Sequence, residues 1–76
     1  MDITERVLKI ISEEIKTPVD KINLKEDIRD MGIDSLATVE IIIAIEEELS
    51  IAIPEDSVED LQTVQDIVSL CNRLHS

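Results

Sequence analysis

Aromatic side chains are missing from this 76-residue sequence, which has no Phe, Tyr or Trp. Proteins that bind single-stranded nucleic acids stack bases on such rings, so nucleic acid is not an expected partner. The one cysteine, Cys71, has no second cysteine with which to form a disulfide or a metal cluster. No apolar stretch approaches the roughly 20 residues that span a bilayer, and no basic leader precedes an apolar run. We therefore expect a cytoplasmic monomer that does not insert into membranes.

Glycine and histidine are also scarce, since each occurs once, as Gly32 and His75. A nucleophilic serine needs an adjacent general base, and the only histidine lies one residue before the end of the sequence. A calcium loop with Gly32 at its sixth position would place Arg29 and Met31 where oxygen ligands are required. The sequence therefore predicts neither an enzyme nor a metal site.

Negative charge dominates the chain, which has 18 acidic and 7 basic residues and a formal net charge of −11. The segment 1–25 is neutral, whereas the segment 26–66 has thirteen acidic residues and a single basic one, Arg29. A solvated acidic surface can serve only to keep a small protein soluble. A one-sided field also attracts basic patches on other proteins, so we expect basic partners and repulsion of polyanions and anionic membranes.

The apolar spacing predicts an all-α fold, a bundle of three main helices plus one short helix with a long first loop. Asp2 and Glu5 resemble a capping box that opens a helix from Ile3 to about Ile15. No repeat or linker divides the chain, so residues 1–76 are expected to form a single domain. The loop that follows is expected to be held on the core by Val19, Ile22, Leu24, Ile28, Met31 and Ile33.

The remaining helices are predicted from the same signals. The second main helix is expected to run from Ser35 to about Leu49, and a short helix is expected from Pro54, in its first turn, through Asp60. A second pair of capping residues opens the last helix, which carries an apolar stripe with Cys71 as a buried thiol. This cap and stripe are formed by Thr63, Asp66, Val64, Ile67, Val68, Cys71 and Leu74.

The second main helix has two apolar faces when successive residues are turned by about 100°. The expected core face consists of Thr38, Ile41, Ile42, Ile45 and Leu49. Roughly opposite are Leu36, Glu40, Ile43 and Glu47, with Val39 at the margin. Aliphatic residues that alternate with carboxylates fit a partner groove that is both basic and apolar, although exposed aliphatic residues also occur singly on many surfaces.

Ser35 follows Gly32 and Asp34 at the predicted start of this helix. A hydroxyl at a helix start is exposed and lies close to unpaired N–H groups that favour a phosphate. We interpret Ser35 as an attachment point. The alternative is a residue that only caps the helix or occupies its first turn.

The run Gly32-Ile33-Asp34-Ser35-Leu36, followed by Val39-Glu40 and by residues 44–49, resembles the acyl carrier proteins of the fatty-acid-synthase type. The similarity in order and spacing covers nearly the whole chain. The resemblance implies a carrier that is not an enzyme and that receives 4′-phosphopantetheine from coenzyme A on Ser35, through a phosphopantetheinyl transferase. The prosthetic thiol would hold acyl chains as thioesters.

The resemblance also implies that the second helix docks basic patches of acyl-chain synthases, reductases, dehydratases or acyltransferases. The candidate partner-binding residues are Asp34, Leu36, Val39, Glu40, Ile43, Glu47 and Glu48. Ala37 and Leu49 stand where the family often has an acid and an aromatic residue, which leaves fatty-acid, specialised lipid, polyketide and aminoacyl pathways open. The alternative of a different class is a non-covalent acidic helical adaptor or inhibitor, in which Ser35 is only a helix cap.

Overall fold

The fold is known from a computed structural model that describes residues 2–75. Its elements are α1 (Ile3–Ile15), η1 (Val19–Lys21), η2 (Ile28–Met31), α2 (Ser35–Leu49), α3 (Glu55–Glu59) and α4 (Val64–His75), where η1 and η2 are 3-10 helices. In the described part of the chain the extended pairing is limited to one isolated bridge, between Asp27 and Thr63. The predicted all-α bundle of three main helices and one short helix is confirmed.

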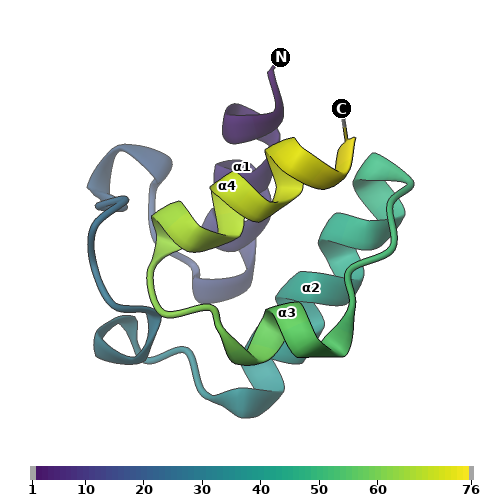
Figure 1. Ribbon diagram of the computed structural model, residues 1–76. Coiled ribbons are helices and arrows are strands. Elements are labelled where there is room, and N and C mark those ends of the chain that lie inside the picture. The colour runs from purple at the N-terminus through teal and green to yellow at the C-terminus, as the bar shows by residue number, and fades with distance from the viewer. Residues whose placement is uncertain (1, 76) are drawn as a thin grey trace.

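Figure 1 shows α4 crossing in front of α1, with α2 and the short α3 on one side and the α1–α2 connection on the other. Helix α1 packs against both α4 and α2. Both ends of the chain lie at the end of the molecule opposite to the start of α2 (Figure 1). The first turn of α2 is therefore far from either terminus.

The helix starts are fixed by side-chain caps close in sequence. The Oδ1 atom of Asp2 accepts a hydrogen bond of 2.9 Å from the Glu5 N–H. At the start of α4, Asp66 Oδ2 accepts from the Thr63 N–H at 3.1 Å, and Thr63 Oγ1 accepts from the Asp66 N–H at 3.2 Å. Both predicted capping pairs are confirmed. Pro54 precedes α3 as its N-cap instead of lying in its first turn, because its extended ψ of 143° is not helical.

The core is aliphatic and lies between the three main helices. Its α2 side is the face predicted for the core, except that Thr38 is only half-buried. Cys71 is fully buried, as predicted. The buried residues of the three helices are Val7, Ile11, Ile41, Ile42, Ile45, Leu49, Val64, Ile67, Val68, Leu70 and Cys71.

The long connection between α1 and α2 is held by backbone hydrogen bonds to the turn before α4 and to the first turn of α4. The Ile28 N–H donates to the Gln62 carbonyl at 2.9 Å, and the Gln65 N–H donates to the Leu24 carbonyl at 2.8 Å. Ile28 and Ile33 are buried, and Ile22, Leu24 and Met31 are half-buried against the core. The prediction was wrong for Val19, whose side chain is 40% exposed because η1 forms an outer turn in which Ile22 makes the core contact.

Candidate functional site

The start of α2 combines a glycine turn, a helix N-cap and an exposed serine hydroxyl. Gly32 ends η2 with a φ of 80°, in the left-handed region that glycine enters without steric cost. Asp34 is the N-cap of α2, and its Oδ1 accepts from the Ala37 N–H at 2.8 Å. Ser35 is the exposed first residue of the helix, and its hydroxyl makes no hydrogen bond to any residue in the range 2–75. Ser35 is therefore a first-turn residue and not the helix cap, which Asp34 makes.

A groove of about 540 Å³ opens beside Ser35, between η2, α2 and α3. Apolar side chains form most of its wall, and Asp34, Glu59 and Arg29 are its charged residues. The other lining residues are Ile28, Ile33, Ser35, Thr38, Val39, Val58, Leu61 and Gln62. The exposed hydroxyl therefore stands at a concave surface with an apolar wall and a charged margin.

Arg29 is a residue of this groove that the sequence analysis did not select. Its guanidinium donates from Nε to Asp27 Oδ1 at 3.2 Å and from Nη2 to Asp27 Oδ2 at 3.0 Å. Hydrogen bonds from the Arg29 side chain and backbone hold the pKa of Asp27 below its usual value. The available signal in the sequence was its position as the only basic residue between Glu26 and Asp66.

The outer face of α2 carries the apolar residues predicted there. Leu36 is 68% exposed, and Val39 and Ile43 are each 49% exposed. Glu40 and Glu47 are also exposed on this helix. Val39 and Ile43 line a second groove of about 490 Å³ between α2 and α3, whose charged residues are all acidic. The structure therefore brings exposed aliphatic and acidic side chains together, as the periodicity predicted.

Two glutamates near the end of α2 also hold the fold together. Glu48 accepts a hydrogen bond of 2.8 Å from Arg6 Nη2 through its Oε2, and its carbonyl accepts from the same nitrogen at 2.9 Å. Glu46 Oε2 accepts from the Ile53 N–H at 2.8 Å. Of the predicted partner-binding acids, Glu48 thus has a basic partner within the chain, whereas Glu40 and Glu47 have none among residues 2–75.

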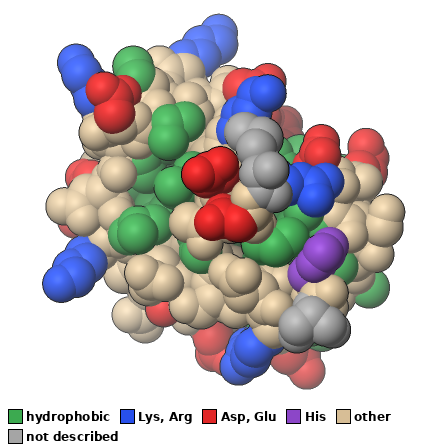
Figure 2. All heavy atoms as spheres, turned by 90° about the horizontal axis from the view of Figure 1, so that it is seen from above, with side chains coloured by type: hydrophobic (Ala, Val, Ile, Leu, Met, Phe, Trp, Pro, Cys, Tyr) green, Lys and Arg blue, Asp and Glu red, His purple; other side chains and the backbone are tan. Residues whose placement is uncertain are grey.

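Like charges meet where α1 passes α2. The Glu40 carboxyl beside Glu14 raises the pKa of Glu14, mainly because the two can share a hydrogen bond only when one of them is protonated. Acidic and basic side chains both lie at the opposite end of the molecule, which carries the two termini (Figure 2).

The other candidate chemistries find little support in the described residues. Within residues 2–75 no group of three or more His, Cys, Asp or Glu is arranged to hold a metal ion. Burial raises the pKa of the Cys71 thiol to about 11, which keeps it protonated at neutral pH. In the same range no helix is both long and apolar enough to cross a membrane.

Comparison with known families identifies the kind of site. The sequence profile described as "phosphopantetheine attachment site" matches residues 5–71. The chain belongs to the phosphopantetheine-attachment family of acyl carrier proteins. The prosthetic group of this carrier is 4′-phosphopantetheine, and its role is to carry and not to catalyse. Members of the family interact with phosphopantetheinyl transferases and with enzymes that handle acyl groups.

Individual relatives agree with this assignment. Proteins named acyl carrier protein from two strains of Caulobacter vibrioides are 47% identical to this carrier over 68 residues, which cover 88% of its chain and 87% of theirs. The acyl carrier protein of Phenylobacterium zucineum is 46% identical over 68 residues, or 88% of this chain and 86% of its own. The crystal structure of an acyl carrier protein from Thermotoga maritima has the same fold, with a TM-score of 0.80 and 16% identity over 92% of this chain and 82% of its own.

Proposed function

We propose that Ser35 is the residue of this carrier that bears 4′-phosphopantetheine, and that residues 1–76 act as a single carrier domain in fatty-acid synthesis or related lipid synthesis. The main support is the Ser35 hydroxyl, which is exposed and has no hydrogen-bond partner among residues 2–75. Because Asp34 caps the helix, a phosphodiester on Ser35 would break no side-chain hydrogen bond among residues 2–75.

The proposed attachment needs nothing from this chain except an accessible oxygen. A phosphopantetheinyl transferase joins Ser35 Oγ to the pantetheine-bearing phosphorus of coenzyme A, and the bond from that phosphorus to adenosine 3′,5′-bisphosphate breaks. The hydroxyl proton passes to a base of the transferase. When attached, the arm supplies a thiol that holds an acyl group as a thioester. The groove of about 540 Å³ beside Ser35 has room for part of such an arm.

The proposed docking surface is the outer face of α2, where apolar anchors lie among carboxylates. It consists of Asp34, Leu36, Val39, Glu40, Ile43, Glu47 and Glu48. Exposed aliphatic residues supply contact area, and the carboxylates favour basic patches on the transferase and on acyl-chain enzymes. The ion pair between Arg6 and Glu48 makes Glu48 the least available of these acids.

The attachment site is tested by mass spectrometry after incubation with coenzyme A and a promiscuous phosphopantetheinyl transferase. We expect one added 4′-phosphopantetheine on the wild type and none on Ser35→Ala. Ser57→Ala, which removes a hydroxyl from α3, is the matched control and is expected to be loaded like the wild type. Loading of Ser35→Ala would show that another side chain is used. A folded wild type that is never loaded would favour the acidic adaptor instead.

The pathway is tested by the load that the carrier holds in its native cell. Fatty-acid synthesis predicts a series of saturated or β-hydroxy acyl chains on the protein, detected as thioesters in the intact mass. A uniform polyketide or aminoacyl load would contradict it. The dense acidity around Ser35 supports an acyl load, because the segment 26–66 holds thirteen acids and one base.

A further inference from the structure

Among the residues that line the groove beside Ser35, Arg29 is the only basic one. The segment 26–66 contains no other basic residue, and η2 places Arg29 on the groove that Ser35 also lines. The other charged residues of that groove, Asp34 and Glu59, are both acidic. The guanidinium of Arg29, with acidic residues around it, therefore lies on the same concave surface as the Ser35 hydroxyl.

Asp27 fixes the orientation of this cation. Its carboxylate accepts from Arg29 Nε at 3.2 Å and from Nη2 at 3.0 Å, and it also accepts from the Arg29 N–H at 2.8 Å. The planar guanidinium is thereby held at one edge, which leaves the Nη1 amine and the second Nη2 hydrogen as donors. The Arg29 side chain is 75% exposed, so these donors are accessible from solvent. Arg29 is thus oriented before any ligand arrives.

A phosphodiester at Ser35 would need such a donor. It adds a negative charge next to Asp34 and close to Glu59, in the most acidic part of the chain. The first N–H groups of α2 offer partial compensation, but the N–H groups of Ala37 and Thr38 already donate to Asp34. A charge-assisted hydrogen bond from a guanidinium is the stronger and more directional contact for a phosphate oxygen.

We propose that Arg29, held by Asp27, donates to the phosphodiester that joins the prosthetic arm to Ser35 and holds the base of the arm over the shared groove. The proposal rests on Ser35 being the attachment residue. Arg29 is a positioning residue in this view, because it bonds to the phosphate and takes no part in thioester chemistry. Its removal changes where the arm points without removing the hydroxyl that receives it.

The first experiment compares the unloaded and loaded wild type by NMR of the arginine Nε–H groups in ¹⁵N-labelled protein. Loading is expected to shift the Arg29 Nε–H signal. Arg6 is the internal control, because its guanidinium pairs with Glu48 at the other end of α2. The signal of Arg6 is expected to stay in place. The Arg29 shift should shrink as sodium chloride is added, since salt screens an exposed ionic contact.

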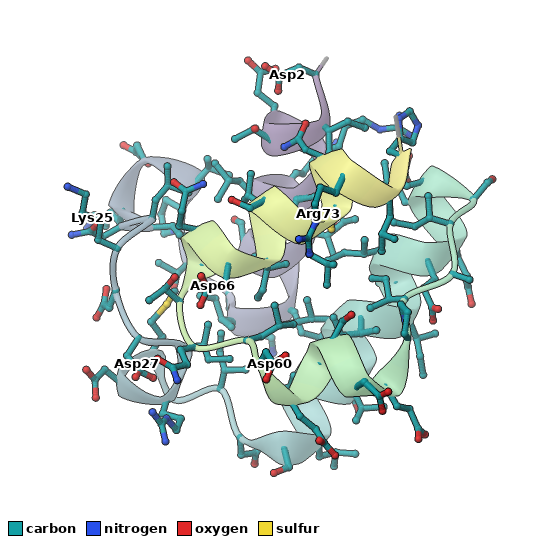
Figure 3. All side chains as sticks on the ribbon, viewed as in Figure 1. Asp2, Lys25, Asp27, Asp60, Asp66 and Arg73 are labelled. Atoms are coloured by element: carbon teal, nitrogen blue, oxygen red, sulfur yellow. The ribbon has the colours of Figure 1, made fainter. Side chains whose placement is uncertain are left out.

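The second experiment follows the ³¹P signal of the loaded protein in matched variants. Arg29→Gln is expected to move this signal away from its wild-type position, and Arg29→Lys is expected to restore part of the difference because it keeps the charge without the planar fork. Lys25→Gln is the control, since it removes a cation from the same connection but from outside the groove. Lys25 and Asp27 are labelled in Figure 3, where the Lys25 side chain extends outward from the connection.

The outcomes separate this proposal from the assignment of Ser35. Suppose that the wild type is loaded on Ser35, that loading leaves the Arg29 Nε–H signal in place, and that Arg29→Gln leaves the ³¹P signal in place. The contact is then refuted and the attachment site stands. If the wild type is not loaded on Ser35, the proposed function fails and this proposal fails with it. If Arg29→Gln is unfolded or is not loaded, the wild-type comparison of Arg29 with Arg6 decides alone.

Discussion

Cys71 shows how burial controls the chemistry of a single residue. Its side chain is fully buried in α4, and burial raises the pKa of the thiol to about 11. The reactive thiolate is therefore nearly absent at pH 8. We expect a maleimide to leave the folded, unloaded carrier unmodified, and to add once to the loaded carrier, on the prosthetic thiol. Intact mass spectrometry measures both.

The control for this prediction is the unfolded chain. In urea, Cys71 loses the burial that raises its pKa, so the unloaded protein is expected to gain one maleimide. Rapid modification of the folded, unloaded protein would mean that α4 opens often enough to expose the thiol. The same pKa shift predicts that stability declines in strongly alkaline solution, because the thiol ionises first in the unfolded state.

Asp34 and Ser35 are neighbours with different positions at the start of α2, which the sequence indicated only in part. The motif around Ser35 pointed to attachment, but Asp and Ser are both favoured at helix N-caps. Local sequence does not decide which of two adjacent capping residues lies at the boundary, because helix ends are uncertain by a residue or two. The structure assigns the cap to Asp34 through its bond to the Ala37 N–H.

At the scale of helices, the contact between α1 and α2 includes an unfavourable pair of carboxylates. The Glu40 carboxyl raises the pKa of Glu14, so the folded state binds a proton more tightly than the unfolded chain. The contribution of this pair to the stability of the folded state is therefore greatest at acid pH, and it falls as the pH rises through the raised pKa of Glu14. We expect Glu14→Gln to raise the melting temperature at pH 7, measured by circular dichroism.

The size and pH dependence of that gain identify its cause. At a pH below the ordinary glutamate pKa of 4.5, Glu14 is protonated and the variant is expected to match the wild type. Glu13→Gln removes the same charge from the neighbouring position on α1 and is expected to stabilise less. Equal gains for the two variants would assign the effect to net charge and not to the pair with Glu40.

The charged face of α2 is expected to act on rates of encounter. Glu40→Lys should lower kcat/KM for loading by the transferase by up to roughly tenfold at low salt, because electrostatic steering acts mainly on association. The fold should survive, since a lysine beside Glu14 replaces a repulsion with an attraction. Asp20→Lys makes the same charge change on exposed η1 and is the control.

This prediction depends on ionic strength. The difference between Glu40→Lys and the wild type should shrink in high salt, where exposed charges are screened. An equal loss for Asp20→Lys would indicate that net charge alone governs the encounter. An unchanged rate for Glu40→Lys at low salt would remove Glu40 from the docking surface.

The ends of the main helices could be predicted because their caps are local. Glu5 lies three residues after Asp2, and Asp66 lies three residues after Thr63, so each pair is visible in a short window. The two 3-10 helices were not predicted, because the backbone of their connection is held by contacts distant in sequence, such as the bond from Ile28 to Gln62.

The ion pair of Glu48 illustrates the same limit for the site. Its partner Arg6 lies 42 residues away, on another helix, and no local pattern joins the two. The family resemblance placed Glu48 on the docking surface. Only the packing of α1 on α2 shows that an internal cation already occupies one of its oxygens. The same holds for Arg29, which reaches the groove through the path of the first connection.

At the scale of the whole molecule, the net negative charge of the carrier is concentrated in one part of the sequence. The first third of the sequence is neutral, and the segment from Glu26 to Asp66, with thirteen acids and one base, has a charge of −12, which Arg73 brings to the net −11. Basic side chains are visible around the face near the termini (Figure 2). A partner with a basic patch is therefore attracted more strongly by the segment 26–66 than by the neutral first third, which favours approach toward the start of α2.

The same charge density works against the folded state. A compact chain with a net charge of −11 repels itself more than an expanded chain does, so screening should favour folding. We expect sodium chloride or magnesium chloride to raise the melting temperature at pH 7. A gain of about 1 kcal/mol corresponds to roughly 4–8 °C for a domain of this size. The matched control is the same titration near the isoelectric point of about 4.2, where the net charge is close to zero and the response should largely disappear. A flat response at pH 7, or an equal one at both pH values, would mean that self-repulsion does not limit the stability of this fold.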